Sequence, residues 1–338
     1  MIIEAKELKD AVGKCAPGVD AGTGLLQAGK IIFVPGYIMG CGTSINVRVP
    51  CPAVDMSIMV DKTSLDKILS KATGNITILG DTTGITVKHG RSRVTLPCSE
   101  VPASLPTFPE ELTPAPADFI TKLAAVAFPN KSGYAGVAWD CEAYSGFIAT
   151  DSIRIVTAEC EGLPGGAWLP TAAVSAITKA GRVATHVLND MPYIHVQYDD
   201  GTLCSVLYRA INDFPIPALC DYINSFKDAT VTATAPFNEE VLGAIKEAEG
   251  FTDVFSQQMP VHITFAPGTI SVNAVNSSGE FCGEAPWDGE YSGHFTVDAS
   301  PFRLMKSGVQ ATVKNVGESG VILALEGNGA TVLLSPDV

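Results

Sequence analysis

Charged residues are scarce in this 338-residue chain. Asp, Glu, Lys and Arg make up 17% of it, against about 25% in an average globular protein. Basic residues are the rarer kind, 22 against 36 acidic ones, which gives a formal net charge of −14. Hydrophobic residues account for 46%. This composition excludes a disordered chain and indicates one that buries a large core.

Other absences narrow the class further. No apolar run approaches the ~20 residues that a membrane-spanning helix needs, and the opening MIIEAKELKD lacks the apolar segment of a signal peptide. The nine cysteines form no C-x-x-C pair and have no histidines at zinc spacing. Most lie in strand-like runs, where a free cysteine behaves as a small buried hydrophobe: Cys41, Cys51, Cys141, Cys160 and Cys204. We therefore expect a cytoplasmic protein that uses no membrane, no metal and no other cofactor.

Catalytic motifs are also missing. The chain contains no G-x-x-x-x-G-K-[ST], no H-E-x-x-H and no G-x-S-x-G. Asp151, in the segment Ala149-Thr150-Asp151, is either a catalytic carboxylate or a side chain that caps a turn. Because no paired acid or nucleophile accompanies it, we favour the turn and expect that the protein is not an enzyme.

A repeated pattern is the strongest positive signal. Three times, a run with apolar residues at helical spacing leads into two or three short alternating strands. The distance from helix to last strand is 31 residues from Leu65 to Leu96, 32 from Val174 to Val206 and 30 from Phe302 to Val332. An earlier half of each copy repeats helix and strands 57, 55 and 61 residues upstream, at Leu8, Phe119 and Val241. Equal spacing indicates one structural unit used three times.

The repeat predicts an α+β fold of three similar domains, each with two helices packed on antiparallel β-sheets. We expect the domains at residues 1–115, 116–229 and 230–338. The first boundary is the stretch from Pro97 to Pro116, which holds six prolines and is expected to be an extended linker containing a short edge strand. The second boundary begins at Phe214-Pro215-Ile216-Pro217 and ends at the strand-like TVTATA around Thr230.

Three segments resemble one known family, the bacterial DNA sliding clamps (the β subunit of DNA polymerase III). They are GRSRVTLP from Gly90 with the later Leu105-Pro106, GFIATDSIRIV from Gly146, and YRAINDFPIP from Tyr208. Their order and intervals match that family across nearly the whole chain. The resemblance implies three clamp domains per chain and a head-to-tail ring, most simply a homodimer, around double-stranded DNA. It implies that the ring tethers a DNA polymerase for processive replication and needs no catalytic residue.

The distribution of charge fits helices that face DNA. The six expected helices, at 6–14, 61–71, 117–131, 170–182, 238–249 and 299–309, carry 13 basic and 9 acidic residues, which leaves 9 basic and 27 acidic residues elsewhere. Contacts from such helices to phosphates carry no sequence information. The candidate DNA-facing residues are Lys9, Lys14, Lys67, Lys71, Lys122, Lys131, Lys179, Arg182, Arg303 and Lys306. The segment 238–249, with four acids and one lysine, departs from this pattern.

The resemblance also implies a pocket where the polymerase and the clamp loader dock through short linear peptides. Carried over position by position, it comprises Tyr134, Thr150, Ser152, Ile153, Arg154, Ile155, Leu333, Ser335 and Pro336. Ile153 stands where the family usually has histidine, and the tail Ser335-Pro336-Asp337-Val338 replaces Met-Pro-Met-Arg-Leu. These departures favour a diverged version from a phage or mobile element, with a more apolar pocket.

A second set of residues is expected at the ring interface. Arg91, Arg93, Val94 and Leu96 lie in an expected edge strand of the first domain. The family pattern places Glu280 and Glu284 of the third domain on the acidic edge that meets this strand at the ring interface. Phe251, Val254 and Phe255 are expected to supply the apolar part of that interface. The alternative hypothesis is a repeat β-rich structural or scaffold protein that does not bind DNA. Ring formation separates the two hypotheses. A hydrolase with an unrecognised site is a third, which any turnover would reveal.

Overall fold

The computed structural model describes residues 1–20, 26–80, 84–128, 132–140, 142, 144–152, 154–179, 182–250, 260–276, 279–287, 289–298, 308–316, 320–327 and 329–334. It forms two compact units, one of residues 1–115 with 175–208 and the other of 116–174 with 209–338. The middle of the chain thus contributes strands to both units. The domain limits expected from the repeat remain predictions.

The first unit contains a twelve-stranded sheet in the order β1-β6-β7-β8-β5-β2-β3-β4-β16-β15-β14-β9. In chain order the strands are β1 Ile2–Glu4, β2 Lys30–Val34, β3 Tyr37–Cys41, β4 Ile45–Pro50, β5 Ile58–Asp61, β6 Asn75–Gly80, β7 Gly84–His89, β8 Ser92–Ser99, β9 Thr113–Pro114, β14 Ala184–Asp190, β15 Tyr193–Tyr198 and β16 Leu203–Leu207. β4 and β16 pair antiparallel, with Val47 opposite Cys204, and this pair makes the sheet continuous.

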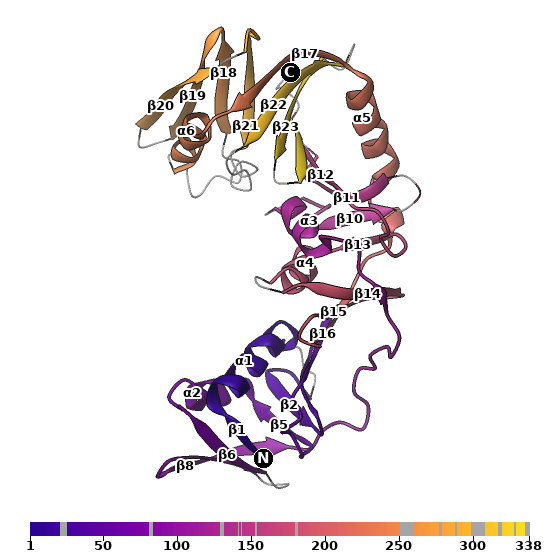
Figure 1. Ribbon diagram of the computed structural model, residues 1–338, viewed down its shortest axis with the longest axis vertical. Coiled ribbons are helices and arrows are strands. Elements are labelled where there is room, and N and C mark those ends of the chain that lie inside the picture. Colours follow the sequence, from indigo (N-terminus) through magenta and orange to yellow (C-terminus); the bar gives the residue numbers. More distant parts are fainter. Residues whose placement is uncertain are drawn as a thin grey trace. The chain divides into compact units, whose positions relative to one another are not determined.

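Two helices of this unit lie side by side, α1 (Ala5–Cys15) and α2 (Lys62–Leu69) (Figure 1). α1 buries Leu8, Val12 and Cys15 at helical spacing. Asp61 caps the start of α2: its carboxylate accepts a hydrogen bond of 2.7 Å from the backbone N–H of Ser64. Both helices were expected from the sequence. The short strand expected in the proline-rich linker is β9, which pairs with β14 and forms the outer edge of the sheet.

The second unit contains an eight-stranded sheet, β13-β10-β11-β12-β24-β23-β22-β17, and a four-stranded sheet, β20-β19-β18-β21. The strands of the larger sheet are β10 Val137–Asp140, β11 Tyr144–Thr150, β12 Arg154–Glu159, β13 Ala167–Leu169, β17 Thr230–Phe237, β22 Val309–Asn315, β23 Val321–Gly327 and β24 Ala330–Leu334. Those of the smaller sheet are β18 Pro260–Ala266, β19 Gly268–Asn276, β20 Gly279–Trp287 and β21 Gly293–Asp298. The pair β12–β24 joins the two halves of the larger sheet.

Helices cover both faces of the larger sheet. α3 (Phe119–Val126) packs on one face, where Phe119 contacts Phe147 of β11 with ring centroids 5.5 Å apart. α5 (Ile216–Asp228) packs on the other face (Figure 1). α6 (Glu239–Gly250) covers the smaller sheet, and α4 (Thr171–Ile177) contains the boundary between the two units. Two short 3-10 helices, Ala16–Gly18 and Ile211–Asp213, complete the helical segments described.

The expected helices at 117–131 and 170–182 are shorter in the structure, and the expected helix at 299–309 falls almost entirely outside the described residues. α5 was not expected, because Pro215 and Pro217 were interpreted as the start of a linker. Proline is well tolerated in the first turn of a helix, where the missing N–H has no partner to lose. In the part of the chain that the structure describes, no helix is long and apolar enough to cross a membrane.

Candidate functional site

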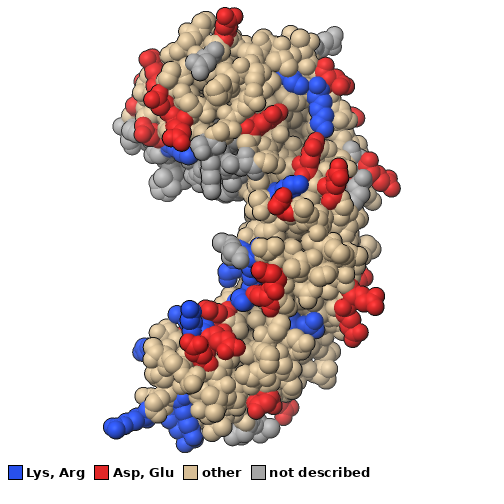
Figure 2. All heavy atoms as spheres, viewed as in Figure 1, with Lys and Arg blue, Asp and Glu red and all other residues tan. Residues whose placement is uncertain are grey.

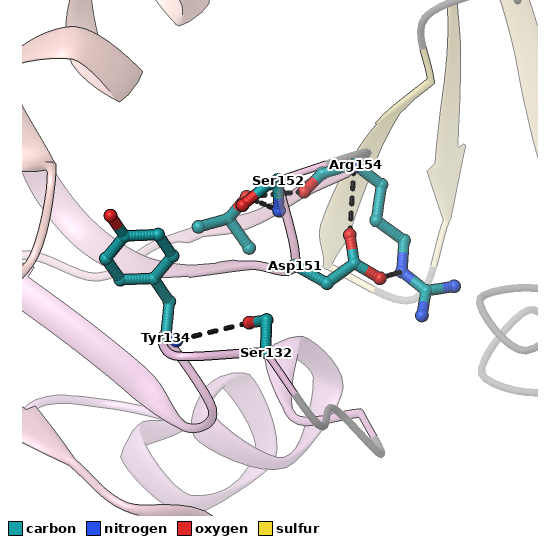
Figure 3. A network of polar contacts seen from close by, with 6 residues as sticks. Ser132, Tyr134, Asp151, Ser152 and Arg154 are labelled. Carbon is teal, nitrogen blue, oxygen red and sulfur yellow. Dashed lines mark hydrogen bonds and ion pairs between the residues drawn. The ribbon is translucent and has the colours of Figure 1, made fainter. Parts of the chain in front are cut away.

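The turn between β11 and β12 holds the polar residues of the expected pocket (Figure 3). Thr150 donates a hydrogen bond of 2.8 Å from Oγ1 to the carbonyl oxygen of Arg154, and accepts one of 3.1 Å from the N–H of Ser152. The Asp151 carboxylate accepts a 3.0 Å bond from the N–H of Arg154 and pairs with Arg154 Nε at 2.8 Å. Ser152 has a φ of 75°. Asp151 therefore stabilises a tight turn, as the turn hypothesis predicted.

Arg154 does not stand at the rim of the apolar residues, as its place in the expected pocket required. Neighbours in a strand point to opposite faces, so Arg154 and Ile155 diverge. The Arg154 side chain is buried, and its guanidinium lies 4.3 Å from the centroid of the Phe128 ring. Figure 3 shows Arg154 on one side of the turn and Tyr134, which comes from the separate segment of Ser132, on the other. Ile153, Ser335 and Pro336 lie outside the described residues.

The remaining pocket residues do come together, on the face of the sheet that carries α5. We call the apolar side chains of this face the junction surface: Ala138, Ile148, Ile155, Ile322, Ala324 and Leu333, with Tyr134 at its margin. The register places Ile155 of β12 opposite Leu333 of β24, and Leu333 opposite Ala324 of β23. The surface therefore spans the junction between the two halves of the sheet.

α5 covers the junction surface. Its residues Ile216, Cys220, Ile223 and Phe226 recur at helical spacing and are 2 to 7% exposed. They pack with Ile155 and Leu333 in one hydrophobic cluster. Burial raises the pKa of the Cys220 thiol. The sequence contained this signal, because the spacing of these four apolar residues predicts a helix over 216–228.

Both ends of α5 are fixed. Just before its first turn, Phe214 contacts the rings of Trp168 and Tyr134, with centroids 5.4 and 5.8 Å away. At the last turn Lys314 of β22 donates hydrogen bonds from Nζ to the carbonyl oxygens of Phe226 and Lys227, at 3.0 and 3.2 Å. The Phe226 carbonyl also accepts a hydrogen bond of 3.2 Å from the N–H of Ala229, the residue that follows the helix. The last turn is the negative end of the helix dipole, so a cation there is favourable.

An open pocket of about 520 Å³ remains at the C-terminal end of α5. Its wall is Ile223, Phe226 and Lys227 of α5, and its floor includes Thr157, Thr331 and Leu333 of the sheet. Thr157 and Thr331 are opposite each other in β12 and β24. Tyr144, Glu159, Glu326 and Lys122 also line it. Lys227 pairs with Glu159 at 3.5 Å. Burial raises the pKa of the Tyr144 phenol, although a hydrogen bond from its neighbour Thr157 opposes this.

Among the described residues, each of the two expected ring-interface strands has a side on which no other strand pairs. Residues 92–97 of β8 pair with β7, whereas β5 takes only Cys98 and Ser99. Arg91, Arg93 and Val94 there are exposed. β20 is the outermost strand of the smaller sheet, and its Glu280 and Glu284 are exposed. Figure 2 shows basic side chains at the tip of β8 and acidic ones over β20 and α6. Phe251, Val254 and Phe255 lie outside the described residues.

The candidate DNA-facing residues separate into three groups. Lys9, Lys67 and Lys71 of the α1 and α2 region are exposed. Lys14, Lys179 and Arg182 make internal contacts: Lys14 with Asp200 at 2.7 Å, Lys179 Nζ with the Gly13 carbonyl oxygen at 3.1 Å, and the Arg182 guanidinium with the Tyr198 ring at 4.7 Å. Lys122 is half-buried and lines the open pocket, whereas Lys131, Arg303 and Lys306 lie outside the described residues.

Comparison with solved structures identifies this architecture. A DNA polymerase sliding clamp from Bacillus subtilis superposes with a TM-score of 0.78 at 15% identity, over 100% of this chain and 98% of the other. The chain has the fold of bacterial sliding clamps. A DNA polymerase III subunit beta from Pseudomonas aeruginosa gives a TM-score of 0.75 at 14% identity, over 100% and 99% of the two chains. A Helicobacter pylori beta clamp bound to a DNA ligase peptide gives 0.75 at 13%, also over 100% and 99%.

The α+β fold class inferred from the repeat is confirmed by these full-length matches. No protein-family model matches the chain, and no curated protein does. Within the described residues, no three His, Cys, Asp or Glu side chains gather in a way that would hold a metal ion. The cysteines interpreted as buried hydrophobes are buried free thiols at Cys41, Cys51, Cys160 and Cys204, while Cys141 lies outside the described residues.

Proposed function

We propose that this protein is a DNA sliding clamp, a closed ring of chains that encircles duplex DNA and tethers a polymerase during processive replication. The observation that carries the proposal is the end-to-end match with a DNA polymerase sliding clamp, over 100% of this chain and 98% of that one. A clamp acts through topology and needs no bond chemistry. This agrees with a site made of a packed apolar surface and a turn whose one acidic side chain is structural.

The two free edges support ring closure. An unpaired edge strand exposes backbone N–H and C=O groups that another strand can satisfy. β8 offers such an edge with Arg91 and Arg93, and β20 offers one with Glu280 and Glu284. Opposite charge on the two edges favours their pairing over that of like edges. We therefore propose that β8 of one chain pairs with β20 of the next in a head-to-tail homodimer.

The DNA contact is proposed to be weak and indifferent to sequence. Lys9, Lys67 and Lys71 are exposed on or just after two adjacent helices and are free to approach phosphates. Contacts of this kind release counterions and weaken steeply with salt. A ring that slides requires such contacts, because retention comes from closure. We further propose a cytoplasmic protein whose polymerase and loader bind through short linear peptides, as the DNA ligase peptide binds the Helicobacter pylori clamp.

Mass in solution tests ring formation directly. At micromolar concentration, sedimentation should give twice the chain mass of 35.4 kDa. Rings assembled by concentrating dilute chain with nicked circular DNA should survive a salt wash that removes the same chain from linear DNA. Equal loss from circular and linear DNA would show that no topological link exists, and a monomer at all concentrations would exclude the ring.

A further inference from the structure

α5 occupies the surface on which the sliding-clamp proposal places partner peptides. Tyr134, Ile155 and Leu333 belong to the expected pocket, and all three pack in the cluster that contains α5. Ile155 and Leu333 are only 7% and 3% exposed. A partner side chain therefore cannot reach either residue fully unless α5 moves.

We propose that α5 is an intramolecular competitor for the partner peptide, an inhibitory helix that a peptide must displace to reach the junction surface. The inference rests on the proposed function for the identity of the peptide, but the competition itself is a property of this chain alone. α5 presents four apolar side chains along one face, the arrangement by which amphipathic helices bind apolar surfaces.

α5 is a connecting helix that crosses one face of the larger sheet. It connects the segment after β16, near Trp168, to β17 at the far edge of the sheet. α5 packs with Ile155 of β12 and Leu333 of β24, and only Ala229 separates its last residue from β17. It therefore lies over the junction of β12 and β24, and its last turn forms one wall of the open pocket.

The open pocket supplies the route of entry. Its wall is the last turn of α5, and its floor includes Leu333 of the junction surface. A bulky apolar side chain that enters it competes with Ile223 and Phe226 for contact with Leu333. The polar contacts that the structure describes at that last turn include the two hydrogen bonds from Lys314, one from the N–H of Ala229 and the ion pair between Lys227 and Glu159. Lys227 and Glu159 are 54% and 76% exposed, so their pair adds little.

The binding test uses a labelled synthetic peptide with the sequence of residues 214–229, measured by fluorescence anisotropy without DNA. The native chain should bind it weakly, because its own α5 fills the site at high effective concentration. The variant Ile223→Ser/Phe226→Ser should bind it about tenfold or more tightly. A control peptide carrying the same two serines should bind neither protein. Equal binding to native chain and variant, or no binding to a folded variant, would overturn the proposal.

A second measurement covers the case in which the double variant does not fold. Lys314→Met removes the hydrogen bonds to the end of α5 but keeps the apolar stem of the side chain. Maleimide labelling of Cys220, located by peptide mapping, should become several-fold faster in this variant while the mass and Tm match those of Lys246→Met, an exposed control on α6. Unchanged labelling would overturn the proposal. The readouts are peptide binding and the labelling rate of Cys220, and neither depends on DNA or on ring closure, so their failure is distinct from failure of the clamp function.

Discussion

Ile155 and Leu333 are opposite each other in the antiparallel pair β12–β24, and both are buried beneath α5. They belong to segments far apart in the sequence, so their contact helps to hold the two halves of the large sheet together. The same two residues belong to the expected partner-peptide pocket, which stays a prediction. In the structure they are core residues with a helix of the chain itself above them.

Truncating Leu333 should therefore destabilise the second unit. Leu333→Ala leaves a cavity between strand and helix, and such changes cost about 2–5 kcal/mol. Leu79→Ala is the matched control, because Leu79 of β6 is 49% exposed and loses little buried area. Scanning calorimetry should show a clearly lower transition for Leu333→Ala alone. Equal effects of the two substitutions would mean that Leu333 does not belong to the core.

The sequence predicted the elements whose signals are local. α1 and α2 follow from apolar residues at helical spacing, and the turn at Asp151 follows from the tendency of aspartate to accept bonds from nearby backbone. β9 was foreseen because a proline-rich segment can form a strand only at an edge. Each of these inferences needed only neighbouring residues.

What the sequence reasoning missed depends on contacts between distant segments. The positions of Ile155 and Leu333 could be matched to a pocket, but nothing near them showed that residues 216–228 would pack over them. The lysines of α1 also show that contacts with distant segments cannot be predicted from neighbouring residues. Lys14 and Lys9 look alike in the sequence of α1, yet only Lys14 meets Asp200, which lies 186 positions further along. α5 itself could have been predicted had its prolines been interpreted as a helix start.

Reversing one charge should weaken ring closure. Arg93→Glu places like charges on β8 and β20, and we expect the dimer to dissociate at about tenfold higher concentration, equivalent to ~1.4 kcal/mol. Lys246→Glu makes the same charge change on α6 and should have little effect. Adding Glu284→Arg to Arg93→Glu should restore part of the affinity if the two strands face each other. Sedimentation equilibrium measures all four proteins, and a Lys246→Glu effect as large as that of Arg93→Glu would point to net charge alone.

Low pH should reduce the stability of the first unit, because it protonates the Asp200 carboxylate. Burial by itself would raise the pKa of this carboxyl, but hydrogen bonds from Lys14 and Thr202 outweigh burial and lower the pKa to about 2. Because the pKa is lower in the folded chain than in the unfolded one, the ionised carboxylate stabilises the fold at pH values above the unfolded pKa of ~3.9. This stabilisation is lost as the pH falls toward 2. Native chain should therefore lose more stability than Asp200→Asn between about pH 4 and 2. Parallel Tm-against-pH curves for the two proteins would contradict this assignment.

Removing single lysines should identify those that contact DNA. If Lys67 meets a phosphate, Lys67→Ala should reduce the slope of log affinity against log salt by about 0.9, because one fewer counterion is released. The same reasoning applies to Lys9 and Lys71, which are also exposed. Lys179→Ala should change the slope less, since its ammonium is hydrogen-bonded to Gly13. Lys246→Ala, on the acidic helix α6, serves as the control. Titration with duplexes of two unrelated sequences should give the same slopes for each protein. A slope change at Lys179 larger than at Lys67 would place the DNA against the C-terminal end of α1 rather than against the exposed lysines.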